Sequence, residues 1–151
     1  MIMNHMRLNN SLSHVVGIDP GTKTGFAVYC KTTKTLIDVR TLKIHDAFNE
    51  VKLLKEACIS NGTKLFVRVE DARKRKRYGA NSSAKVQGAG AIKIQCKQWE
   101  EFLKSEMISH ELVAPQRLRT KVDAKKFKQI TGWGTRTSNH GRDAAMMVYG
   151  L

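Results

Sequence analysis

Three acidic residues stand out because each lies where the chain would hold a side chain rigidly. Asp19 ends an apolar run before a Pro-Gly turn, Glu70 ends a second apolar run, and Asp143 lies in a C-terminal segment with helical spacing. Gathered carboxylates repel one another unless a positive charge lies among them. The pattern predicts either a cluster neutralised by lysine or a site for a divalent metal such as Mg²⁺, which prefers oxygen ligands. Two such ions can activate water and stabilise the leaving oxygen of a phosphodiester.

Two strands and a turn surround Asp19. The apolar run Val15 to Ile18 predicts a buried strand, Pro20-Gly21 breaks it, and Gly25 to Val28 resumes a β pattern. Asp19 is therefore expected at a strand end, held by rigid backbone yet open to a ligand. For Asp-Pro-Gly taken alone, an ordinary hairpin with a polar turn residue is the commoner explanation, so the role of Asp19 depends on the rest of the chain.

The next segments predict a meander followed by a helix. Thr35 to Leu42 is rich in β-branched and apolar residues, and Lys31 to Lys34 would be the turn before it. The first three strands should therefore be antiparallel. Asp46 opens a predicted helix whose apolar residues recur at steps of three and four, and Asn61-Gly62 ends it.

A crossover connection places the second acid beside the first. Lys64 to Val69 predicts a fourth strand, and Glu70 follows directly. Because a helix separates this strand from the meander, the fourth strand should lie parallel to the first. Asp19 and Glu70 would then lie at the same edge of one sheet, on neighbouring strands.

A long helix is predicted from Ser83 to Glu106. It contains Gly88 and Gly90, and two glycines cost a helix about 2 kcal/mol against alanine. We expect close packing, against the sheet or against the helix of a partner, to offset this cost.

The last elements carry the third acid. Glu111 to Ala114 predicts a short fifth strand, and Asp123 can cap a brief helix that ends before Gly132. Ser138 to Tyr149 predicts a C-terminal helix in which His140 and Asp143 share one face. The fold class is therefore α/β, with a five-stranded mixed sheet of three antiparallel strands and then two parallel ones, flanked by helices. We expect a flexible tail at 1–13 and a single domain at 14–151.

Charge indicates the kind of partner. The 151 residues include 27 Lys and Arg against 13 Asp and Glu, a net charge of +14, which favours a polyanion such as nucleic acid. An anionic membrane surface is less favoured, because no basic amphipathic helix with an aromatic face is predicted, and no apolar run is long enough to span a membrane. Three scattered cysteines without metal-ligand spacing indicate reduced thiols and a cytoplasmic, intracellular protein.

Basic residues concentrate in two segments. The first follows Glu70 directly and consists of Arg73, Lys74, Arg75, Lys76 and Arg77. The second follows the predicted fifth strand and includes Arg119, Lys121 and Lys125. A run of charges is often only a solvated surface, but its place beside a strand-end carboxylate favours contact with nucleic acid for the first segment.

Three regions contain these acids, in chain order: Gly17-Ile18-Asp19-Pro20-Gly21-Thr22-Lys23-Thr24-Gly25, Val69-Glu70-Asp71 and His140-Gly141-Arg142-Asp143-Ala144-Ala145. In this order they resemble the signature regions of the RuvC-type Holliday junction resolvases, which belong to the RNase H-like nuclease superfamily. The first also occurs in other RNase H-like proteins, so the ordered set is the stronger signal. The resemblance covers the chain from about Val15 to its C-terminus and implies an RNase H-like fold.

The resemblance also implies roles for individual residues. Asp19, Glu70 and Asp143 would be catalytic metal ligands, and His140 would be a further ligand or would orient the attacking water. Arg119, Lys121 and Lys125 are candidates to contact the scissile phosphate, and the long helix resembles the one through which these resolvases dimerise. The basic run after Glu70 is a departure, because it exceeds what the family pattern predicts there and would also suit generic affinity for branched DNA.

The sequence therefore predicts a crossover junction endodeoxyribonuclease that resolves four-way DNA junctions by paired symmetric nicks. It would act as a homodimer with Mg²⁺, for which Mn²⁺ would substitute, and would have no small-molecule substrate and no membrane partner. Two alternatives stay open. The first is another enzyme, either a broader nuclease for branched or flapped DNA or an RNA-processing relative. The second is a non-catalytic basic module that binds nucleic acid.

Overall fold

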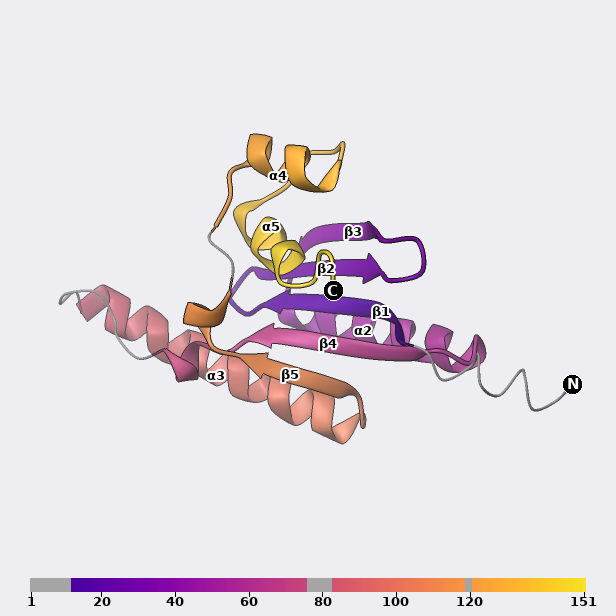
Figure 1. Ribbon diagram of the computed structural model, residues 1–151. Helices are drawn as coiled ribbons and strands as arrows, with labels where there is room; N and C mark the ends of the chain where they lie inside the picture. The colour runs from indigo at the N-terminus through magenta and orange to yellow at the C-terminus, as the bar shows by residue number, and fades with distance from the viewer. Residues whose placement is uncertain (1–11, 76–82, 119–120) are drawn as a thin grey trace, which may run out of the picture.

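The computed structural model describes residues 12–75, 83–118 and 121–151, and shows a five-stranded sheet in the order β3-β2-β1-β4-β5 (Figure 1). The strands are β1 (Leu12–Asp19), β2 (Thr24–Cys30), β3 (Thr35–Leu42), β4 (Lys64–Glu70) and β5 (Ser109–Val113). β1, β2 and β3 pair antiparallel, whereas β4 and β5 extend the sheet in parallel from β1. The predicted mixed sheet is confirmed.

Helices cover both faces of this sheet. They are α2 (Ile44–Ser60), α3 (Ser83–Ser105), α4 (Ala124–Thr131) and α5 (Asn139–Met146), with single 3₁₀ turns at η1 (Ala72–Lys74) and η2 (Pro115–Arg117). α2 and α3 lie on one face, and α5 lies on the other with α4 beyond it (Figure 1). Among the described residues, none of the helices has the length and apolar character that crossing a membrane requires.

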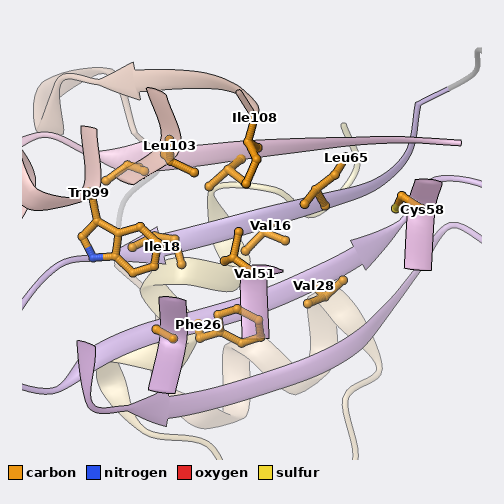
Figure 2. Packing of buried hydrophobic residues seen from close by; sticks show 13 residues of the cluster. Val16, Ile18, Phe26, Val28, Val51, Cys58, Leu65, Trp99, Leu103 and Ile108 are labelled. Atoms are coloured by element: carbon orange, nitrogen blue, oxygen red, sulfur yellow. The ribbon is translucent and has the colours of Figure 1, made fainter. Parts of the chain in front are cut away.

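Strand alternation divides the core between the two faces. On the α2 and α3 face, Val16 and Ile18 of β1 pack with Trp99 and Leu103 of α3 and Val51 of α2 (Figure 2). All five side chains are fully buried. Because successive strand residues point to opposite faces, the intervening positions pack against α5 in a second cluster.

Two glycines let α5 lie directly on the sheet. A Cβ atom at Gly17 would lie 2.1 Å from the carbonyl oxygen of Ala144, and one at Gly25 would lie 2.0 Å from that of His140. Real Cβ atoms do not approach backbone so closely, so any side chain here would displace the helix. The glycines of the first signature region therefore set how close α5 comes to the ends of β1 and β2.

Several predicted boundaries differ from those of the structure. β1 begins at Leu12, and Ser13 accepts a 2.8 Å hydrogen bond from the Lys31 backbone, so both residues belong to the sheet rather than to the predicted tail. α2 begins at Ile44, two residues before Asp46, because the chain enters the helix from β3 without a side-chain cap and packs Ile44 against the core. β5 begins two residues before the predicted start.

Side chains cap the N-termini of α4 and α5, but the C-terminus of α4 lies where it was predicted and that of α5 does not. Asp123 caps α4 as predicted, through a 2.8 Å bond from the Lys126 backbone, and Gly132 ends it with φ +73°. Ser138 caps α5 by accepting from the Gly141 backbone at 3.0 Å. The regular part of α5 stops at Met146, three residues before the predicted end, where the chain enters turns.

Candidate active site

Parallel pairing brings the first two acids together. Ile18 of β1 and Val69 of β4 are register partners, so Asp19 and Glu70, the next residues, end adjacent strands. A side-chain hydrogen bond joins the two carboxyl groups. This arrangement confirms that both acids lie at the same sheet edge.

α5 brings two further residues to this edge. The Nδ1 atom of His140 lies 3.1 Å from Oδ2 of Asp19. Asp143, one turn later, is half-buried, and its Oδ2 lies 3.3 Å from the Nζ atom of Lys121. Lys121 is the basic partner that a cluster of carboxylates needs, and it reaches the cluster from the segment before α4.

The acids are held in conditions that disfavour their charged forms. Burial raises the pKa of Asp19 to about 6, opposed by the hydrogen bond from Glu70 and reinforced by the charge of Asp143. Burial also raises the pKa of Glu70 to about 7, and both the hydrogen bond to Asp19 and its charge add to the effect. A hydrogen bond between two carboxyl groups needs a proton on one of them, so the pair shares a proton when it forms this bond.

The raised pKa values predict how pH changes the stability of the metal-free protein. A carboxyl group whose pKa is higher in the folded state binds more protons when folded, so its contribution to stability falls as pH rises from about 4 to about 7. Asp19→Asn removes this cost and should raise the free energy of unfolding at pH 8 by about 3 kcal/mol, with little gain at pH 4. Chemical denaturation in a chelator at both pH values measures the difference.

Glu56→Gln is the control for that measurement, because Glu56 is an exposed residue of α2 away from the cluster. Its free energy of unfolding should change little at either pH. A loss of stability at pH 8 in Asp19→Asn would show instead that the Asp19 carboxylate stabilises the fold.

The donor set can be compared with the requirements of Mg²⁺. As the side chains stand, no three described His, Cys, Asp or Glu residues are grouped as metal ligands, so the predicted four-ligand set of Asp19, Glu70, His140 and Asp143 is not assembled. Mg²⁺ needs only one or two carboxylates and otherwise keeps water or substrate phosphate. Asp19 and Glu70 supply two adjacent carboxyl groups, and a bound cation would stabilise their charged forms, which burial disfavours. The pair therefore fits that requirement.

An open pocket of about 540 Å³ lies against this cluster. Its wall includes Asp19, Glu70 and His140 together with Lys23 from the β1–β2 turn and Gln95 from α3. Oε1 of Gln95 is buried and has no hydrogen-bond partner among the described residues. Gln95 could not be identified from the sequence, because its helical spacing carries no chemical signal and only the packing of α3 on the sheet brings it to this pocket.

No protein-family model matches the sequence, and the search of curated proteins finds no significant match. Among solved structures, the chain is similar to RuvC from T. thermophilus in complex with a Holliday junction substrate. The identity is 16%, the TM-score is 0.55, and the match covers 89% of this chain and 90% of that one. This chain has a RuvC-like fold. The similarity confirms the RNase H-like fold that the signature regions implied.

In this RuvC-like fold, the described basic residues after β4 have different partners. Arg73 binds the buried Asp71 through both carboxylate oxygens, with Nε–Oδ1 and Nη2–Oδ2 distances of 2.8 Å, and also approaches Glu100 of α3. The guanidinium of Arg73 therefore links the end of β4 to α3, and the predicted role of Arg73 in binding nucleic acid stays a prediction. Lys74 donates to the carbonyl oxygen of Leu112 at 2.8 Å.

The other predicted basic contacts divide among three places. Arg75 and Lys121 line the pocket beside the acids. Lys125 lies on α4 and lines a different pocket, so the structure does not bring it to the acids. Lys76, Arg77 and Arg119 lie outside the described residues.

Proposed function

We propose that this chain is a metal-dependent endonuclease that cuts four-way DNA junctions, that is, a crossover junction endodeoxyribonuclease. The observation that carries the proposal is the hydrogen-bonded Asp19–Glu70 pair at the open edge of a RuvC-like sheet, with α5 adding His140 and Asp143. The neighbour with that fold was solved with a Holliday junction substrate. A net charge of +14 supports a nucleic-acid substrate.

In this proposal Asp19 and Glu70 hold Mg²⁺ or Mn²⁺, and Asp143 completes the site once Lys121 releases it. The metal, when bound, would supply Lewis-acid polarisation of the scissile phosphate and lower the pKa of the attacking water. The chain's own acids fix its position, because two of them end strands in the middle of the sheet.

His140 has a separate role. In the neutral imidazole one nitrogen donates and the other accepts, so a neutral His140 that donates from Nδ1 to Asp19 has an unprotonated Nε2. Nε2 can then accept a proton from the attacking water. The side chain of His140 is half-exposed and lines the pocket beside the acids.

Lys121 provides a positive charge beside the acids. Its side chain is 81% exposed, so it is free to move from Asp143 to a phosphate oxygen as substrate enters. We assign it to neutralise the scissile phosphate. A module that only binds nucleic acid would gain nothing from three acids that repel DNA, and this favours the enzyme over the non-catalytic alternative.

We also propose that the active form is a homodimer paired through α3. Gly90 lies on the exposed side of this helix with nothing within 4 Å of a Cβ placed there, and Ile94, one turn later, is 62% exposed. Close packing against the described part of this chain therefore does not offset the cost of Gly90 to the helix. A two-fold dimer would present two active sites to the two symmetry-related strands of a junction.

The proposal is tested by incubating the protein with Mg²⁺ and a panel of four-way, three-way, flap, duplex and RNA substrates, with the cuts mapped. We expect preferred cutting of the four-way junction, at symmetric positions on two strands. Cutting of flaps or RNA at the same rate would support the broader nuclease instead. Binding without cutting in either Mg²⁺ or Mn²⁺ would overturn the enzyme proposal.

A further inference from the structure

A second pocket lies outside the proposed active site, and the proposed reaction does not use it. Its volume is about 410 Å³, within the range of small-molecule sites. It lies between α4 and the segment that follows, and we call it the α4 pocket. Its lining includes three basic residues and one aromatic residue: Lys125, Lys128, Arg136 and Trp133.

Every charged side chain among the described residues that line the α4 pocket is basic. Lys125, Lys128 and Arg136 are exposed, and none of them takes part in an ion pair among the described residues. None of the described lining residues is acidic. Cations without partners on a surface are commonly only solvated, but here they surround a hollow that also contains an aromatic ring. Cations with an aromatic surface are the combination that binds a phosphodiester backbone and its bases.

Local hydrogen bonds hold the pocket in shape. Gly132, in the left-handed region, donates its N–H to Lys128 at 2.8 Å and closes α4. The Thr131 hydroxyl donates to the carbonyl oxygen of Phe127 at 2.9 Å and accepts from the Trp133 backbone at 3.1 Å. The aromatic residue is therefore placed by the helix end rather than by a free loop.

Arg142 connects this pocket to the helix that carries the acids. Its guanidinium is buried and donates to the Thr137 carbonyl oxygen at 2.9 Å and to the Val122 carbonyl oxygen at 3.2 Å. Thr137 lines the α4 pocket. The segments before and after α4 are thus joined to α5 by one side chain, next to Asp143 in the sequence.

We propose that the α4 pocket binds one nucleotide of the substrate, with its phosphate against Lys128 and Arg136 and its base or sugar against Trp133. The inference rests on the proposed function only in taking nucleic acid as the substrate. α4 lies on the far side of α5 from the sheet (Figure 1), so the bound nucleotide belongs to a strand that extends beyond the cleavage site. The pocket holds an arm of the substrate and orients it toward the acids.

The test uses the full-length protein in a chelator, so that no cutting occurs, with a four-way junction as the probe. Lys128→Gln and Arg136→Gln should each lower the slope of log K against log salt by about 1, the value for one lost phosphate contact. Lys126→Gln is the matched control, because it removes the same charge from the same helix at an exposed position outside the pocket. Its slope should match that of the wild type.

Tryptophan fluorescence gives a second readout. The chain has two tryptophans, and Trp99 is fully buried, so a change on adding DNA reports Trp133. We expect quenching in the wild type and none in Trp133→Phe, with circular dichroism confirming that each variant folds.

Equal slopes for Lys128→Gln, Arg136→Gln and Lys126→Gln, with unchanged Trp133 emission at saturating DNA, would overturn this inference even if the protein cuts junctions. A lower salt slope in Lys128→Gln and Arg136→Gln, together with quenching of Trp133 by DNA, would support the α4 pocket even if the protein never cuts. That result would contradict only the proposed function. Absence of any binding would contradict both.

Discussion

Asp19→Asn, Glu70→Gln and Asp143→Asn should each lower metal-dependent cutting of a four-way junction by about a thousandfold or more. Each change keeps the size of the side chain but replaces one of the carboxyl groups that we propose as ligands of the metal, namely those of Asp19, Glu70 and Asp143. Binding of the uncut junction should persist and become slightly tighter, because each change removes a negative charge near phosphate. Single-turnover cutting and gel-shift measurements separate the two effects.

The exposed acid Glu56 again offers a control, since Glu56→Gln removes the same charge from α2 without touching the sheet edge. Its cutting rate should equal that of the wild type. If one of the three active-site variants also cuts at the wild-type rate, that residue is not a required ligand. If a variant loses both binding and cutting, a structural role explains the loss better than a catalytic one.

Gly25→Ala should lower the stability of the protein by about 3 kcal/mol and cut activity by more than a hundredfold. The added Cβ would lie 2.0 Å from the carbonyl oxygen of His140 and 3.0 Å from Cβ of Asp19, so α5 must move away from β2 and take His140 and Asp143 with it. Misplacement of reacting groups by about 1 Å costs about a hundredfold in rate. Thermal unfolding and cutting by the remaining folded protein measure the two losses separately.

Gly90→Ala is the matched control for stability. A Cβ at this position meets nothing within 4 Å, and alanine favours a helix by about 1 kcal/mol over glycine, so this variant should be slightly more stable than the wild type. A Gly25→Ala protein that melts and cuts like the wild type would show that α5 has room to adjust, and that its direct contact with β2 does not position the acids.

Local patterns in the sequence were enough to predict the strands and the place of two acids. The β-branched and apolar composition of Thr35 to Leu42 and the cap at Asp123 depend on residues a few positions apart, and the structure has both elements where they were predicted. The pairing of Asp19 with Glu70 followed from a general rule, because a helical crossover makes the two strands parallel and brings their ends together.

The partners of the charged side chains were decided only by the tertiary structure. Arg73 appeared to belong to a basic surface, yet it is bound to Asp71 and to Glu100 on another helix. Lys121 reaches Asp143, and Gln95 of α3 lines the pocket beside the acids. Such partners lie far apart in the chain or on separate elements, and their meeting depends on how the helices pack on the sheet. Spacing within a helix or strand carries no information about that packing, whereas it fully specifies which residues share a face.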